Sequence, residues 1–485
     1  MVRRKRNRKV IKLTINNIYT EIENLDKESK DLVSKFCNLA FLTYKIGWNR
    51  KGTYSNVYKN YFKSDKFPTG WVFEIKALLN DNDIAVDIID NRNKLEDLPK
   101  LTLPDSVEAR KYQDDFVEIT NSKCRGIVRH PTRSGKTYLA AKVIANIPQT
   151  ALVLVPNITL LSQTYDDFVF IFGEENVGKI GGKKFDPKRI TIASPQKLWA
   201  SIDSKEVKDF LKSIGLLFID ECHHVTNTKK LQWYAISQKC INAYYRYGLT
   251  GTLSEDSAFK VLRGTTGKIL QNIEEKDLIA QGYLAQPVLE MYKIFHKNDD
   301  IFAKKSEKVY PDYEIAFAKG ILDNAERNSL IVKIALEEAD ENRSVLILVN
   351  RIEKHGKVLY DMFDGKAVFA SGETKPKDRD AIKKRFLNKE FLILVGTIFG
   401  EGVNIPNLDT VIYAYGGKSK QNVLQGVGRV LTPCKGKKPK IIDFYDIDNG
   451  ILEAQAKKRL KLYEGRDIFK VNLIEDQLSL SFGDA

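Results

Sequence analysis

The sequence predicts an α/β protein in which two tandem parallel-sheet domains follow a small N-terminal α+β domain. Residues 101 to about 285 alternate between helical stretches and five strand-like runs, GIVRH, ALVLVP, ITIAS, LLFID and YRYGLT. Residues 286–450 repeat this alternation with five more, SVLILV, AVFAS, FLILVGT, TVIYAY and KIIDFYD. The run ALVLVP (151–156) is continuously apolar, as expected for a parallel strand buried on both faces. We therefore expect domains at 1–100, 101–285 and 286–450, followed by a C-terminal helix and tail at 451–485.

The length and charge of the chain agree with several domains and a polyanionic partner. A chain of 485 residues suggests about three domains. Its 78 basic and 63 acidic residues leave a formal charge of +15, which favours nucleic acid first and an acidic membrane second. A basic surface that serves only solubility is the alternative.

The cysteines and apolar runs indicate the compartment. The five cysteines are scattered without C-x-x-C spacing, which suits free thiols in a reducing environment. No apolar run is long enough to cross a bilayer, and no signal-peptide core follows the basic N-terminus. We expect a soluble intracellular protein that does not bind membranes.

The N-terminal region predicts short mixed elements. VIKLTI (10–15) favours a strand, residues 21–44 favour a helix, and residues 67–90 favour a turn, a helix and a strand. The run TYSNVYKNYF (53–62) interleaves tyrosines with lysines, so it either stacks on bases or packs as a half-buried strand. The six basic residues within 3–9 form either a phosphate-contacting arm or a solvated tail.

The segment HPTRSGKT (130–137) fits most of the phosphate-binding pattern G-x-x-x-x-G-K-[ST], with His130 in place of its first glycine. It lies between a strand-like run and a predicted helix, where backbone N–H groups and the helix dipole favour a phosphate. Lys136 is expected to bind the β- and γ-phosphates of ATP, and Thr137 to hold Mg²⁺. The nucleotide-binding candidates here are Thr132, Arg133, Ser134, Gly135, Lys136 and Thr137.

Gln113 lies 23 residues before Lys136, in the run that opens the domain. A glutamine amide carries one acceptor and two donors, which suffice to recognise adenine. We expect Gln113 to contact the base, although a lone glutamine is ordinarily a surface residue.

The apolar run LLFID delivers Asp220 and Glu221 to the carboxyl end of a predicted parallel strand, where ligands of such sheets bind. Asp220 is expected to hold Mg²⁺ and Glu221 to activate the attacking water. Cys222, His223 and His224 follow, but no second ligand pair has zinc-site spacing. A coupling role is therefore expected for His223.

Three further loops follow predicted strands. GLTGTLS (248–254) offers Thr250 and Thr252 as links between the nucleotide site and the next domain. Beyond GTIFGEGVNIP (396–406), the segment LQGVGRVL (424–431) carries Gln425 and Arg429. An arginine there can reach a γ-phosphate held by the first domain, because the second domain has no phosphate loop of its own.

Taken together, these strings resemble superfamily 2 helicases. PTRSGKT, DECH, GLTGT, EGVNIP and QGVGR resemble motifs I, II, III, V and VI in the right order, ARKYQ resembles the adenine-reading motif, and the likeness covers about 110–465. Two RecA-like domains are implied. The chain is most similar to the phage UvsW-type branch-migration helicases, in which a small domain comes first. Residues 1–100 are expected to form that domain here and to bind nucleic acid, as duplex or junction.

The resemblance implies residue roles. Catalytic roles fall to Lys136, Asp220, Glu221, Gln425 and Arg429, coupling roles to His223, Thr250, Thr252, Gly402 and Asn404, and nucleic-acid contacts to Pro156, Gln196 and Thr397. The chain departs from the family where Gly426 and Thr432 replace two arginines of motif VI, and where Asn404 replaces an aspartate.

The implied activity is ATP- and Mg²⁺-dependent translocation on DNA with 3′→5′ unwinding, junction migration and fork regression, in recombination, repair and replication. The expected partner is branched or forked DNA bound through its backbone, the expected state a monomer, and the expected location the host cytoplasm if a phage encodes the chain. The alternatives are an RNA helicase, a duplex translocase that does not unwind, and an ATP-switched nucleic-acid binding or annealing protein.

Overall fold

The computed structural model describes most of the chain. It covers residues 10–46, 52–104, 109–131, 133–222, 232–251, 257–296, 302–305, 308–311, 313–396, 405, 407–417, 423, 426, 428–432, 437–466 and 468–475. Two compact units form, one from residues 1–131 and 135–273 and the other from 132–134 and 274–485. Within the described part, no helix is long and apolar enough to cross a membrane.

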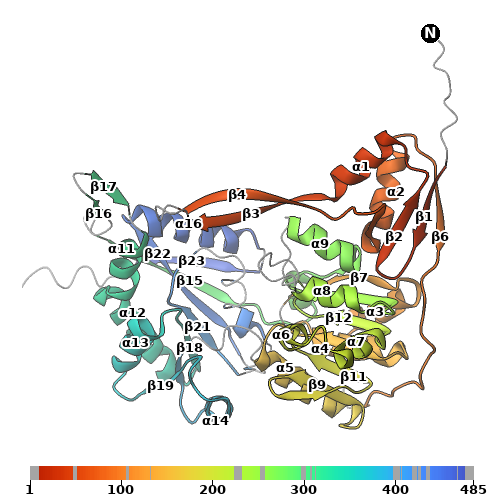
Figure 1. The fold of residues 1–485 in the computed structure, drawn as a ribbon. Helices are drawn as coiled ribbons and strands as arrows, with labels where there is room; N and C mark the ends of the chain where they lie inside the picture. The colour runs from red at the N-terminus through yellow and green to blue at the C-terminus, as the bar shows by residue number, and fades with distance from the viewer. Residues whose placement is uncertain are drawn as a thin grey trace, which may run out of the picture. The chain divides into compact units, whose positions relative to one another are not determined.

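The first unit begins with a small α+β layer (Figure 1), whose sheet has the order β5-β2-β1-β6. The strands are β1 (Ile11–Ile15), β2 (Tyr19–Glu23), β5 (Lys66–Pro68) and β6 (Val86–Asp90), and the helices are α1 (Lys27–Cys37), η1 (Thr69–Trp71) and α2 (Val72–Asn80). Alternate residues of β1 are buried, because one face of the sheet packs against Val33 of α1 and Ile75 of α2.

The helix expected over 21–44 is wrong at both ends. Asp26 starts α1 by accepting a hydrogen bond from the backbone N–H of Ser29 at 2.8 Å, so the preceding residues stay in β2. After α1 the chain enters β3 (Asn38–Ile46), which pairs antiparallel with β4 (Gly52–Asn60) as a long two-stranded ribbon in Figure 1. The apolar run of β3 thus pairs with the next strand along the chain instead of continuing the helix.

The run with interleaved tyrosines and lysines forms most of β4 and the two residues after it. Val57 and Tyr58 are exposed, whereas Tyr61 and Phe62, just beyond the strand, are buried. Lys59 and Asn60, at the end of β4, are half-buried, so among the described side chains the expectation of a half-buried strand holds for the end of β4.

The second part of the first unit is an eight-stranded sheet of order β10-β9-β11-β8-β12-β13-β7-β14, parallel except for β10. Its strands are β7 (Arg125–Arg129), β8 (Ala151–Leu154), β9 (Val177–Gly181), β10 (Lys184–Asp186), β11 (Ile190–Ala193), β12 (Leu216–Ile219), β13 (Tyr245–Thr250) and β14 (Ile269–Asn272). The five expected strands in this region are all present, and β9, β10 and β14 are additional.

Helices cover both faces of this sheet. They are α3 (Lys111–Ser122), α4 (Lys136–Asn146), α5 (Ile158–Phe172), α6 (Pro195–Ala200), α7 (Lys205–Lys212), α8 (Gln232–Lys239) and α9 (Ser257–Thr266). Val153 packs in the core beneath α3, α4 and α5, while its neighbours Leu152 and Leu154 pack in the core beneath α6 to α9. Burial on both faces explains why these strands are continuously apolar.

The small layer and the large sheet are joined by close packing on α9. The indole Nε1 of Trp71 donates to the carbonyl oxygen of Lys260 at 2.8 Å. A Cβ atom at Gly70 would lie 2.0 Å from the carbonyl oxygen of Arg263, and one at Gly264 would lie 2.9 Å from the Trp71 ring. A side chain at Gly70 would clash with the backbone of α9, and one at Gly264 would clash with the Trp71 ring, so glycine at both positions allows η1 and α9 to pack closely.

The second unit contains a seven-stranded parallel sheet of order β19-β20-β18-β21-β22-β15-β23. Its strands are β15 (Val288–Phe295), β18 (Val345–Leu348), β19 (Ala367–Ala370), β20 (Ile393–Gly396), β21 (Thr410–Tyr413), β22 (Lys440–Ile447) and β23 (Lys470–Glu475). The hairpin β16 (Phe302–Lys305) and β17 (Lys308–Pro311) is separate. Five of the seven strands are the expected ones; β15 and β23 are additional.

The helical elements of this unit are α10 (Glu275–Ala280), α11 (Tyr313–Phe317), η4 (Ala318–Leu322), α12 (Ala325–Asp340), η5 (Ile352–Gly356), α13 (Lys357–Asp361), α14 (Pro376–Leu387), η6 (Gly428–Leu431) and α16 (Gly450–Glu464). Arg459 of α16 donates from Nε to the buried carboxylate of Asp443 at 2.9 Å and from a terminal nitrogen to the carbonyl oxygen of Gly417 at 2.8 Å. The C-terminal helix is therefore anchored on β22. The parallel-sheet architecture of both units confirms the expected α/β fold class.

Candidate nucleotide site and nucleic-acid interface

The phosphate loop leads from β7 into α4. Gly135 caps α4 with φ +77°, and Arg133 has φ +71°, so the loop makes a tight left-handed turn directly before the helix. Lys136 is the first residue of α4, and its Nζ donates to the carbonyl oxygens of His130 at 3.3 Å and Pro131 at 3.2 Å. The ammonium group is thus held over the loop at the N-terminus of an 11-residue helix, where an anion is stabilised.

The acidic pair lies at the same edge of the sheet. β7 pairs with β13, and β13 pairs with β12, with Thr250 opposite Arg129 and Ile219 opposite Gly248. The carboxyl ends of β7 and β12 are therefore two strand spacings apart, roughly 10 Å. Asp220 and Glu221 follow β12 at that edge.

The backbone turns sharply at the acids. Glu221 has φ +44°, and its N–H donates to Oδ1 of Asp220 at 2.9 Å. A non-glycine residue rarely adopts this conformation, and such strained residues cluster at active sites and ligand-binding turns. The strained turn at Glu221 therefore marks this strand end as a candidate functional site.

The donor set suits Mg²⁺. A hydroxyl at Thr137, the second residue of α4, and a carboxylate at Asp220 are hard oxygen ligands of the kind that this ion takes alongside waters and phosphate oxygens. Both residues belong to the same edge of the sheet, so they fit the ion expected from the sequence.

Gln113 is buried at the start of α3 and contacts the loop. Its Nε2 donates to the carbonyl oxygen of Gly135 at 3.2 Å, and its Oε1 accepts from the backbone N–H of Arg110 at 3.0 Å. These bonds use one of the two amide donors and one acceptor lone pair, so donor and acceptor capacity remains for a base. Besides its expected contact with adenine, Gln113 ties α3 to the loop.

Two expected nucleic-acid residues meet at the next strand ends. Pro156 follows β8, and Gln196 lies in α6 after β11. The Nε2 of Gln196 donates to the carbonyl oxygen of Pro156 at 3.3 Å, and its Oε1 accepts from the hydroxyl of Ser194 at 2.6 Å. The structure therefore brings these two residues together at the carboxyl edge that also carries the phosphate loop.

The remaining expected residues are only partly visible. Thr250 ends β13, and the backbone of Arg429 lies in η6. Outside the described residues lie Thr132, His223, Thr252, Thr397, Gly402, Asn404 and Gln425.

Comparison with known proteins decides the family. The model of the type III restriction enzyme res subunit matches residues 106–255, and the helicase conserved C-terminal domain matches residues 325–432, so the two together cover more than half of the chain. The chain is a superfamily 2 helicase. It is 28% identical over 341 residues to the ATP-dependent DNA helicase uvsW of Enterobacteria phage T4, a match that spans 67% of this chain and 66% of the phage protein.

Other relatives of the helicase include DNA 3'-5' translocases and helicases. It is 24% identical to the DNA 3'-5' translocase XPB2 of Sulfurisphaera tokodaii over 77% of this chain and 93% of that protein. A match to the putative DNA 3'-5' helicase Rad25 of Haloarcula marismortui, 26% identical, spans 67% of this chain but only 50% of the relative. Among solved structures, Saccharomyces cerevisiae Dbp5 superposes with a TM-score of 0.55 at 14% identity, over 76% of this chain and 90% of that one, which supports the fold.

Cys222, directly after the acidic pair, is part of the helicase core. It is fully buried beneath α6 to α9, and a Cβ atom at Gly248 would lie 3.0 Å from its Sγ. Burial raises the pKa of this thiol well above its usual value. A protonated, enclosed thiol is a poor zinc ligand, and Cys222 instead packs in the core against Gly248 of β13.

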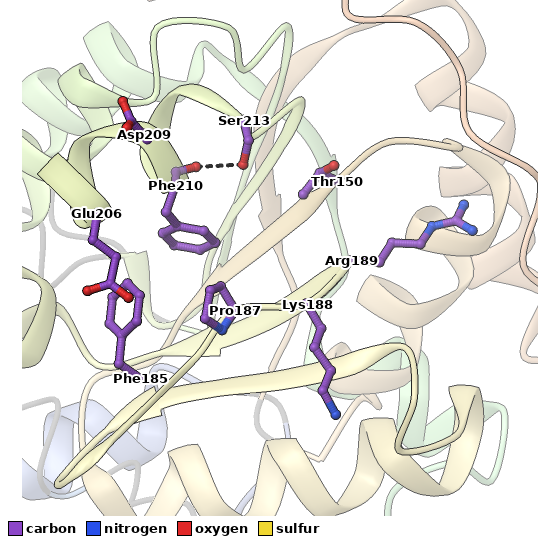
Figure 2. Close-up of a pocket in the computed structure, with 9 residues that line it drawn as sticks. All are labelled: Thr150, Phe185, Pro187, Lys188, Arg189, Glu206, Asp209, Phe210 and Ser213. Carbon is purple, nitrogen blue, oxygen red and sulfur yellow. Dashed lines mark hydrogen bonds between the residues drawn. The ribbon is translucent and has the colours of Figure 1, made fainter.

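A hollow of about 500 Å³ lies at the other edge of the same sheet (Figure 2). Thr150, Arg189 and Ser213, which line it, come shortly before β8, β11 and β12, at the amino ends of those strands. Apolar side chains, including Phe185 and Phe210, form part of its wall. This hollow is therefore separate from the nucleotide edge of the helicase.

Sequence reasoning missed one residue of the loop environment. Gln271 of β14 receives a hydrogen bond at 2.8 Å between its Oε1 and the Nε2 of His130. Because 141 residues separate the two, and β14 has no continuous apolar run, no local pattern pointed to this pair.

Proposed function

We propose that the chain is an ATP-dependent DNA helicase and translocase that remodels branched DNA by junction migration and fork regression, with 3′→5′ polarity. The observation that carries the proposal is the edge of the eight-stranded sheet, where Lys136, at the N-terminus of α4, and the acids Asp220 and Glu221 come together. The printed names of the relatives, a DNA helicase and a DNA 3'-5' translocase, support DNA and the polarity.

In this proposal each residue has its own role in ATP hydrolysis. The N–H groups that open α4 and the ammonium of Lys136 bind the phosphates and stabilise the charge that develops during transfer. Mg²⁺ supplies further charge neutralisation when it is held by Thr137 and Asp220. Glu221 orients and deprotonates the attacking water, and we also propose catalytic roles for Gln425 and Arg429.

Hydrolysis is coupled to movement through loops at the same edge. Thr250 ends β13, which lies between β12 and β7, while Pro156 and Gln196 follow β8 and β11 on the other side of β12. We propose that His223, Thr252, Gly402 and Asn404 also serve coupling, and that Thr397 also contacts nucleic acid. Contacts to the sugar-phosphate backbone position a protein without reading sequence, so we expect little sequence preference and strong weakening by salt.

The decisive experiment measures Mg²⁺-dependent ATPase rates and strand displacement on matched substrates. Single-stranded, duplex, forked and four-way DNA of one sequence are compared with the corresponding RNA forks. Stimulation and unwinding that are greatest on forked and four-way DNA support the proposal. Preference for RNA, stimulation by duplex without strand separation, or turnover too slow for translocation would replace it with an RNA helicase, a duplex translocase or an ATP-switched binding protein respectively.

The proposed roles in recombination, repair and replication follow from the branched substrate and depend on that result. The proposed monomeric state is tested separately by light scattering of the chain with and without forked DNA. A dimer on the fork would contradict it.

A further inference from the structure

His130, which replaces the first glycine of the phosphate-loop pattern, is held by three hydrogen bonds. His130 is fully buried directly after β7. Its backbone N–H donates to the carbonyl oxygen of Thr250 at 3.0 Å, and its carbonyl oxygen accepts from Nζ of Lys136 at 3.3 Å. Its side chain adds a third link, from Nε2 to Oε1 of Gln271 at 2.8 Å.

The hydrogen bonds of the Gln271 amide determine which ring nitrogen of His130 carries the proton. Its Nε2 donates to the backbone carbonyl oxygen of Tyr112 at 2.9 Å, so its Oε1 faces the imidazole and can only accept. His130 must therefore carry its proton on Nε2. Burial lowers the pKa of the imidazole to about 4, with the nearby ammonium of Lys136 acting in the same direction, so the ring is neutral at physiological pH.

Together, these hydrogen bonds and that of Gln113 form a ring that connects both ends of the phosphate loop to the start of α3. Tyr112 packs edge-on against the imidazole, with ring centroids 5.3 Å apart, and its neighbour Gln113 donates to Gly135 at the other end of the loop. The entry of the loop at His130 and its exit at Gly135 are thus both tied to the start of α3. A glycine at position 130 would leave Gln271 without this partner and would break the ring.

We propose that His130 and Gln271 are positioning residues that pre-organise the phosphate loop against α3, and that their hydrogen bond sets the affinity for a nucleoside diphosphate. The inference rests on the proposed nucleotide site. A loop whose ends are fixed before binding loses less conformational freedom when it closes around phosphates, so breaking the bond weakens binding.

The second unit offers a matched control. His355 is also fully buried, and its Nε2 lies 3.2 Å from Oδ1 of Asn328. Burial lowers its pKa to about 3, so it too is a neutral histidine paired with a side-chain amide. His355 belongs to η5, and its amide partner Asn328 belongs to α12.

The experiment titrates the full-length chain and its variants with Mg·ADP by calorimetry and records the melting temperature of each. His130→Phe keeps the ring packing but removes the bond, and it should weaken Mg·ADP binding about tenfold. His130→Gln retains a donor at the same reach and should bind within about twofold of the parent. His355→Phe should lower the melting temperature about as much as His130→Phe does, while its Mg·ADP affinity stays within about twofold of the parent.

Gln271→Met provides a second route if His130→Phe fails to fold, because Gln271 is only partly buried; it should weaken binding as His130→Phe does. Normal affinity in His130→Phe or Gln271→Met, no rescue by His130→Gln, or equal weakening by His355→Phe would overturn the positioning role. A parent chain that binds no Mg·ADP would instead overturn the nucleotide site itself, and the inference with it.

Discussion

Replacement of Lys136 by alanine is the most direct test of the proposed chemistry. The ammonium group is the positive side chain that the loop places at the start of α4. Loss of one pre-organised group that stabilises transition-state charge lowers kcat by about 10²–10³, or roughly 2.7–4 kcal/mol. DNA-stimulated ATPase should therefore become nearly undetectable, while DNA binding remains.

The structure also indicates how much folding stability Lys136→Ala can cost. Lys136→Ala removes two hydrogen bonds to backbone carbonyls, at about 0.5–1.5 kcal/mol each. Folding should survive that loss, and thermal melting will verify it. Lys142 is a matched control on the same helix, because its Nζ pairs with the carboxylate of Asp114 away from the loop.

The assay is phosphate release with saturating forked DNA, alongside fork binding by fluorescence anisotropy. Lys142→Ala should keep the parental rate within about twofold, because a partly exposed ion pair contributes little to stability. If Lys136→Ala retained more than about a tenth of the parental rate while melting normally, the phosphate-loop assignment would be refuted.

Three further predictions follow from the same site and from the buried histidines. Glu221→Gln should bind ATP and the fork yet hydrolyse ATP at least about a hundredfold more slowly, measured in a single-turnover chase; normal turnover would transfer the water-activating role to another group. Arg429→Ala should lower kcat by about tenfold to a thousandfold without loss of DNA affinity, and a near-normal rate would place the arginine function elsewhere. Because burial lowers the pKa of His130 and of His355, the unfolded chain takes up protons below about pH 6.5 before the folded chain does, so stability is lost as pH falls. The loss should reach about 2 kcal/mol per histidine at pH 5 in denaturant titrations, and the variant with glutamine at both positions should have a flatter profile, whereas an unchanged slope would assign the effect to other groups.

Much of the fold was predictable because burial on both faces leaves a strong local pattern. ALVLVP, LLFID and SVLILV became the central strands β8, β12 and β18, since any polar side chain there would be buried without a partner. The phosphate loop and the acidic pair were found for a related reason, as both stand directly after such strands.

The rest depended on strand pairing that no local pattern shows. Residues 38–46 carry a pattern compatible with a helix, but they form a strand because they pair with β4, the next strand along the chain. β23 lies at the edge of its sheet and mixes exposed with half-buried residues, so its sequence gives little signal before β15 is known. The contact between His130 and Gln271 likewise arises only once β14 pairs with β7.

The glycine contact between η1 and α9 limits how the N-terminal layer can be studied. Only a short segment separates α9 from Thr250 at the nucleotide edge. The N-terminal layer therefore packs on a helix that follows closely after the nucleotide site in the chain. Removing the residues before about position 95 would remove Trp71 from α9 and expose the apolar surface that it covers. A truncated protein would therefore lose stability as well as any DNA recognition by this layer. Substitutions at exposed positions such as Tyr58 would test DNA recognition without disturbing this contact. Transfer of the N-terminal layer to another helicase would require that the contact surface of α9 be transferred with it.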